Sequence, residues 1–120
     1  MRRRHPLLWP TALALLLSVP AFAADDAAQL ALGKKLFTQT AVPACALCHT
    51  LQDAGSEGAV GPMLDELKPD ANRVAAALRN GLGQMPSYKG TLTEEQISAI
   101  ARYVSKASGG AQPMPNQADN

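Results

Sequence analysis

The stretch Cys45-Ala46-Leu47-Cys48-His49 carries the most specific pattern in the chain. Its spacing, C-x-x-C-H, is the signature of covalent haem attachment. Two thiols this close along the chain can form thioether bonds with the two neighbouring vinyl groups at one edge of a porphyrin. The following imidazole is then held where one of its nitrogens can bind the iron. The motif therefore predicts that Cys45 and Cys48 attach one haem c and that His49 is an axial ligand.

Three other interpretations of Cys45 and Cys48 fit the sequence less well. A disulfide between them would close a very short loop, and such a bridge constrains the unfolded chain only weakly. A redox-active C-x-x-C of the thioredoxin type belongs in a β-α-β pattern, whereas the sequence around this motif predicts helices. A structural zinc site needs four ligands, and His49 is the only histidine besides His5 near the N-terminus. Haem attachment is the interpretation that remains.

The first 23 residues have the organisation of a secretory signal peptide. Arg2–His5 is a positive n-region, Leu7–Val19 is an apolar run, and Ala21–Ala23 supplies the small-x-small pattern of a cleavage site. The apolar run is too short for a comfortable membrane span. We therefore predict a signal peptide at residues 1–23 that is cleaved after Ala23, export to the periplasm, and no membrane anchor after cleavage.

The mature chain of 97 residues is predicted to form a single domain at 24–108, followed by a flexible polar tail at 109–120. Removing the leader leaves eight Lys and Arg residues against ten Asp and Glu residues, a net charge of −2. A chain with this charge and no basic cluster gives no reason to expect nucleic acid as a partner. A domain of this size with few aromatic residues has a thin core, so a large cofactor would supply apolar contact area that the sequence lacks.

Acidic residues mark the start of the first two predicted helices. The first helix covers about Asp26–Thr38, with Asp25 and Asp26 favourable at its positive end. The second covers Ala71–Asn80, and Asp70 is its N-cap.

The third predicted helix has the clearest start. Thr93 and Gln96 form a capping box, and the helix ends at Gly109. The segments 50–69 and 81–90 are predicted to be mostly loop, and no segment of the mature chain has a credible alternating strand pattern.

The second axial ligand follows by elimination. His49 is the only histidine of the mature chain, and methionine with histidine is the common ligand pair of electron-transfer cytochromes c. The mature chain offers Met63, Met85 and Met114. Met63 lies close to His49 in sequence, and Met114 lies in the polar tail. Met85 lies in a loop, with a whole predicted helix between it and His49, and it is the predicted ligand.

The landmarks of the chain resemble the class I cytochrome c family across nearly the whole mature sequence. They are Cys45–His49, Gly61-Pro62, Met85-Pro86 and a last helix that carries Tyr103. The resemblance implies an all-α fold in which about three helices wrap around one covalently bound haem. It also implies an electron-transfer protein rather than an enzyme.

Two structural details follow from the same resemblance. The first and last helices would cross near Gly33, Phe37 and Tyr103. The carbonyl of Pro62 would accept the second ring N–H of His49, a contact that fixes the ring and raises its basicity as a ligand.

Three stretches resemble the small haem subunit of bacterial sulfite dehydrogenases: Val42–Cys45, Gly61–Asp70 and Gly83–Tyr88. This second resemblance implies that a molybdenum-containing catalytic subunit donates single electrons to the chain, which passes them to a downstream cytochrome. The alternative is a free shuttle cytochrome that serves other periplasmic redox enzymes. A haem enzyme or gas sensor with an open iron position fits less well, because Met85 would occupy that position.

Overall fold

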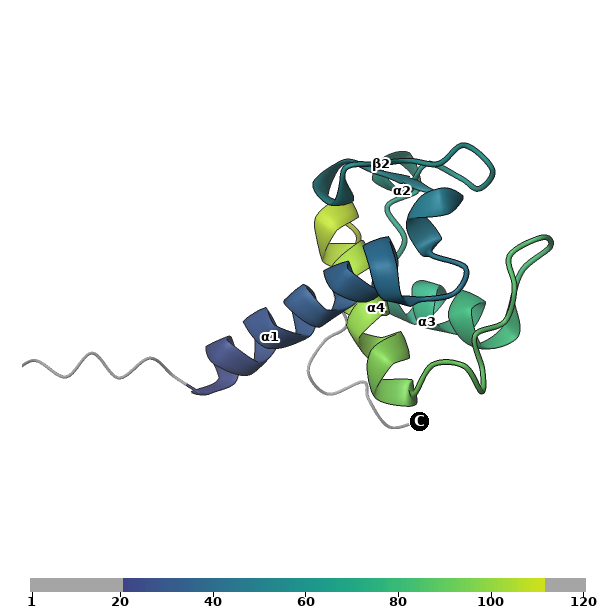
Figure 1. Cartoon of the computed structure of the whole chain (residues 1–120). Coiled ribbons are helices and arrows are strands. Elements are labelled where there is room, and N and C mark those ends of the chain that lie inside the picture. Colours follow the sequence, from purple (N-terminus) through teal and green to yellow (C-terminus); the bar gives the residue numbers. More distant parts are fainter. Residues whose placement is uncertain (1–20, 112–120) are drawn as a thin grey trace, which may run out of the picture.

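The computed structural model describes residues 21–111, so the predicted n-region, the apolar run of the leader and Met114 lie outside the described residues. The described part is mostly helical, which confirms the all-α prediction (Figure 1). No helix within these residues is long and apolar enough to cross a membrane. The α-helices in the described part are α1 (Ala21–Lys35), α2 (Leu64–Leu67), α3 (Ala71–Asn80) and α4 (Glu94–Ser108).

The crossing of α1 and α4 is the centre of the fold (Figure 1). A Cβ atom added to Gly33 would lie 2.2 Å from the carbonyl oxygen of Ala99 and 2.6 Å from the Cβ of Tyr103. The rings of Phe37 and Tyr103 meet edge to face, with centroids 6.0 Å apart and an interplanar angle of 66°. The predicted crossing near these residues is therefore confirmed, and glycine is what lets the two backbones come so close.

The start of the first helix differs from the prediction. The described residues are helical from Ala21 onward, so α1 already includes the Ala-rich sequence before Asp25, which favours helix. In this chain, which includes the residues before Ala24, Asp25 and Asp26 lie inside the helix and not in its first described turn, so the predicted place at the positive end is not found here. Asp26 instead forms an ion pair with Arg102 of α4. The helix runs through the predicted cleavage point after Ala23, and the cleavage itself stays a prediction.

The predicted helix boundaries of α3 and α4 are confirmed, together with their caps. The Asp70 side chain accepts a hydrogen bond from the backbone N–H of Arg73 at 2.8 Å. The Thr93 hydroxyl accepts the N–H of Gln96 at 3.1 Å, and the Gln96 side chain accepts the N–H of Thr93 at 2.9 Å. Gly109 ends α4 with φ of +81°, a left-handed conformation that glycine adopts without strain.

One face of α4 is buried from end to end. Its most deeply buried apolar side chains are at most 2 % exposed, and they are Ile97, Ala99, Ile100, Ala101 and Val104. This face packs against α1 and α3, and the burial follows the helical repeat.

The segment 50–69 contains more structure than the predicted loop. A short antiparallel hairpin pairs β1 (Thr50–Leu51) with β2 (Ser56–Glu57), and α2 follows it. The Ser56 hydroxyl accepts the backbone N–H of Leu51 at 3.0 Å. Strands of two residues are too short to show alternation in the sequence, which is why the prediction missed them.

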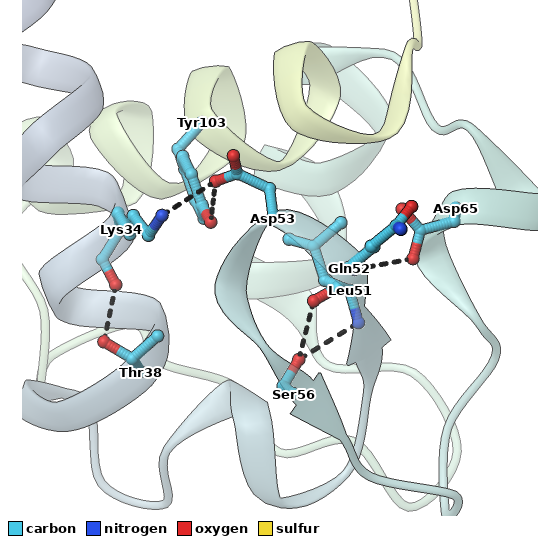
Figure 2. A network of polar contacts seen from close by, with 8 residues as sticks. All are labelled: Lys34, Thr38, Leu51, Gln52, Asp53, Ser56, Asp65 and Tyr103. Carbon is cyan, nitrogen blue, oxygen red and sulfur yellow. Dashed lines mark hydrogen bonds and ion pairs between the residues drawn. The ribbon is translucent and has the colours of Figure 1, made fainter.

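A polar network joins this hairpin to the helix crossing (Figure 2). Asp53, in the turn between β1 and β2, accepts a hydrogen bond from the Tyr103 hydroxyl at 2.7 Å and forms an ion pair with Lys34 at 3.2 Å. The hydrogen bond from Tyr103 and the nearby Lys34 ammonium hold the pKa of the Asp53 carboxyl below its usual value. The carboxylate form is therefore present at neutral pH and ties the hairpin turn to α1 and α4.

Candidate haem-binding site

A cavity of about 710 Å³ opens between α3, α4 and the loops on either side of them. Its volume is within the usual range of cofactor sites, and its walls are mostly apolar, as such sites are. Predicted site residues from distant parts of the sequence meet on its wall: Cys45, Cys48, His49, Pro62 and Met85.

A 3₁₀ turn at Cys45–Leu47 holds the C-x-x-C-H motif. The backbone N–H groups of Cys48 and His49 both donate to the carbonyl of Cys45, at 3.1 and 3.0 Å. Side chains three residues apart lie on the same side of such a turn. The local fold therefore directs the two sulfur-bearing side chains to the same side.

The ring of His49 is held by the loop that follows the hairpin. Its Nδ1 atom lies 2.8 Å from the carbonyl oxygen of Pro62. A carbonyl oxygen can only accept, so Nδ1 carries the hydrogen and the lone pair of the neutral ring is on Nε2. This tautomer presents a metal-binding nitrogen on the far side of the ring.

Two glycines allow this loop to lie against the motif. A Cβ atom on Gly61 would be 2.4 Å from Cε1 of His49, and one on Gly58 would be 2.6 Å from the backbone nitrogen of His49. The N–H of Gly61 also donates to the carbonyl of Cys48 at 2.7 Å. The sequence showed a glycine-rich segment here, but only the packing explains which atoms need the space.

Met85 lies in the loop between α3 and α4 and lines the cavity. Leu82 and Met85 exchange two backbone hydrogen bonds of 3.0 Å each, which close the loop into a tight turn. Met63 is 46 % exposed and is not among the residues that line the cavity. Of the methionines within residues 21–111, Met85 is therefore the one that shares a cavity with His49.

The two cysteines are not joined by a disulfide in the structure. Burial raises the pKa of the Cys45 thiol to about 11. Redox-active cysteines need the thiolate, and their sites lower the thiol pKa to obtain it. The environment of Cys45 instead raises the pKa of its thiol. Within the described residues, no group of three or more His, Cys, Asp and Glu side chains is placed to hold a metal ion.

The residues of the cavity fit a covalently attached haem. An apolar wall suits a porphyrin, two cysteines stand at one place on that wall, and the His49 tautomer leaves Nε2 able to bind iron.

Tyr88 and Arg73 are among the cavity residues to which the sequence had assigned no role in the site. Tyr88 is 4 % exposed, and its hydroxyl donates to the carbonyl of Pro43 at 2.6 Å. Burial raises the pKa of this phenol to about 12, so it stays a donor at neutral pH. Arg73 is the only Lys, Arg, Asp or Glu among the described residues that line the cavity. The sequence offered one indication of Tyr88, its position three residues after Met85, and none of Arg73.

Comparison with known proteins gives consistent matches. Residues 28–104 match the family model described as cytochrome c oxidase, cbb3-type, subunit III. The chain is 36 % identical to cytochrome c6 of Tetradesmus obliquus over 93 residues, which cover 69 % of this chain and 96 % of that protein. It is 34 % identical to cytochrome c6 of Leptolyngbya boryana over 81 residues, which cover 64 % of this chain and 91 % of the relative.

A solved structure is also similar to this chain. It is the crystal structure of the c-type cytochrome SorU from Sinorhizobium meliloti, with 53 % sequence identity and a TM-score of 0.67. The match covers 72 % of this chain and 99 % of that chain.

Proposed function

Because this chain belongs to the family of class I c-type cytochromes, electron carriers with one covalently bound haem c, we propose that it accepts electrons from a periplasmic sulfite-oxidising molybdenum enzyme. The observation that carries the proposal is the resemblance of three stretches to the haem subunit of sulfite dehydrogenases. Each of those stretches, Val42–Cys45, Gly61–Asp70 and Gly83–Tyr88, contributes residues to the wall of the cavity.

Within this proposal, the residues of the site have separate tasks. Cys45 and Cys48 would attach the haem, and His49 and Met85 would bind its iron. The Pro62 carbonyl keeps Nδ1 of His49 protonated and the ring in place, as the 2.8 Å contact between them allows. The haem, once bound, supplies reversible one-electron exchange. The apolar wall of the cavity excludes water from it and so favours the state with less charge.

Electrons would enter and leave beside the attachment motif. Val42 is 83 % exposed and Leu47 is 68 % exposed, and the segment 41–48 contains no charged residue. Contact surfaces commonly include exposed apolar side chains. A partner that docks there comes close to Cys45 and Cys48, and electron tunnelling needs such a short gap.

The stoichiometry requires a second partner. Oxidation of sulfite to sulfate consumes one water and releases two protons and two electrons, whereas a monohaem carrier holds one electron. The chain is therefore reduced twice per turnover and passes each electron to a further cytochrome. Exposed Lys68 and Lys89 have the charge to orient an encounter, but isolated surface charges contribute little to affinity.

Mass spectrometry of the natively exported protein should find one haem that survives denaturation. We expect both Cys45 and Cys48 to carry thioether bonds, because the turn at Cys45–Leu47 sets both at the same cavity wall. The same spectrum should show a chain that begins at Ala24 if the leader is cleaved as predicted. Cys45 and Cys48 found as a disulfide in this material would contradict the assignment.

Rapid mixing tests the proposed donor. The oxidised holoprotein is mixed with the purified sulfite-oxidising enzyme and sulfite, and reduction is followed by absorbance. Fast reduction that needs both enzyme and sulfite supports the proposal.

The alternative function is a free periplasmic shuttle. The lack of charged residues in the segment 41–48 favours it, because a contact without charges imposes little selectivity on partners. No reduction by the sulfite-oxidising enzyme, together with fast reduction by unrelated periplasmic donors, would establish the shuttle instead.

A further inference from the structure

The hydroxyl of Tyr88 connects two loops that are distant in the sequence. Tyr88 belongs to the loop 81–90, which carries Met85, and Pro43 belongs to the segment 41–44, which precedes the haem-attachment motif. The 2.6 Å hydrogen bond between them spans 45 residues. Within residues 21–111, no other hydrogen bond joins these two loops.

The remaining polar contacts of the Met85 loop are local. The N–H of Tyr88 donates to the carbonyl of Leu78 at 2.7 Å, and the Ser87 hydroxyl donates to the carbonyl of Arg79 at 2.5 Å. The backbone carbonyl of Tyr88 accepts the N–H groups of Thr91 and Leu92. These bonds attach the loop to the end of α3 and to the start of α4. None of them fixes its distance from the side of the cavity where the motif lies.

Few other contacts hold the loop 81–90 in place. Leu82, Gly83, Gln84, Pro86 and Ser87 are exposed, whereas Tyr88 is buried. Segments with few buried contacts open locally at a small fraction of the global unfolding free energy. A thioether is a neutral and weak ligand, so its occupancy of an iron site depends on how often the loop that carries it opens.

We propose that Tyr88 is a positioning residue for Met85, acting through its hydrogen bond to the Pro43 carbonyl, which holds the Met85 loop against the attachment segment. The inference rests on the proposed ligation of the iron by Met85. Tyr88 does not bind the iron itself. Its hydrogen bond sets how often the loop opens and makes the iron position of Met85 accessible to other ligands.

Tyr103→Phe is the matched control for Tyr88→Phe. Both tyrosines are nearly buried phenols that donate one short hydrogen bond, Tyr103 to Asp53 at 2.7 Å. Tyr103 lies at the α1–α4 crossing and does not line the haem cavity. If Tyr88 had a purely structural role, Tyr88→Phe would lower stability and, like Tyr103→Phe, leave the cyanide rate unchanged.

The experiment uses the oxidised holoprotein and three measurements: the rate of cyanide binding, the pH at which the near-infrared band of sulfur-ligated ferric haem is lost, and stability in urea. Tyr88→Phe should bind cyanide roughly three- to tenfold faster, the change that the loss of one net hydrogen bond produces. Its near-infrared band should disappear at lower pH. Tyr103→Phe should lose at least as much stability in urea, because its hydrogen bond goes to a carboxylate, while the cyanide rate and the band stay as in the unsubstituted protein.

Two results would overturn the inference: equal cyanide rates for both variants, or a rate in Tyr88→Phe that does not change. A wrong assignment of Met85 as the ligand would give a different result. If Met85→Ala keeps the near-infrared band, Met85 is not the ligand, whatever Tyr88→Phe shows.

Discussion

Gly33→Ala should lower the free energy of unfolding of the holoprotein by about 2 kcal/mol. The added Cβ would lie 2.2 Å from the carbonyl oxygen of Ala99, which is backbone and cannot rotate away. The helices α1 and α4 must therefore separate, and the edge-to-face contact of Phe37 with Tyr103 weakens with them. Overpacking of this kind costs about 3 kcal/mol at the upper end of its usual range, and the better helix propensity of alanine returns about 1 kcal/mol.

Urea denaturation followed by far-UV circular dichroism measures this effect. The midpoint should fall while the dependence on urea concentration is unchanged, as expected for a loss of stability alone. Ala31→Ser is the control, because Ala31 lies on the exposed side of the same helix and surface substitutions usually change stability by less than about 0.5 kcal/mol. Equal midpoints for both variants would mean that the crossing adapts to the extra atom.

The parts of the fold that the sequence predicted are those with local signals. Asp70 caps α3 through a hydrogen bond three residues away, and Thr93 and Gln96 cap α4 over the same distance. The start of α1 was misplaced because Asp25 and Asp26 have the character of helix-start residues. Their place in the structure depends instead on the Ala-rich sequence before them and, for Asp26, on Arg102, 76 residues away.

The hairpin was missed for a related reason. Its strands have two residues each, and their position depends on the close packing of Gly58 against the backbone of Cys48 and on Asp53 reaching Tyr103. Neither contact leaves a periodic pattern in the sequence.

The residues of the candidate site also differ in whether a local sequence pattern indicates them. Cys45, Cys48 and His49 form one contiguous motif, so chemistry alone identified them. Met85 followed by elimination among methionines, and the assignment stays a prediction even though Met85 and His49 line the same cavity. The contact from Tyr88 to Pro43 has no sequence signature, because it joins two irregular loops.

Met85→Ala should have the largest effect on the properties of the haem. Oxidised protein with sulfur on the iron shows a weak near-infrared band, and this band should be absent from the variant. The reduction potential should fall by on the order of 0.1 V, since the axial ligands set haem potentials over a range of about 0.8 V and a thioether favours the reduced iron. Added cyanide or imidazole should bind readily, because alanine leaves the position open. Spectroscopy and a potentiometric titration of the purified holoprotein measure all three.

Met63→Ala is the matched control for this substitution. Met63 is 46 % exposed and does not line the cavity, so its removal should leave the band, the potential and the slow binding of cyanide as they are. The two variants remove the same side chain, and any effect of losing a methionine in general is common to both. A difference between them therefore reports on the position of the sulfur. Loss of the band in Met63→Ala, with Met85→Ala unaffected, would show that the loop after the hairpin, and not the loop between α3 and α4, supplies the ligand.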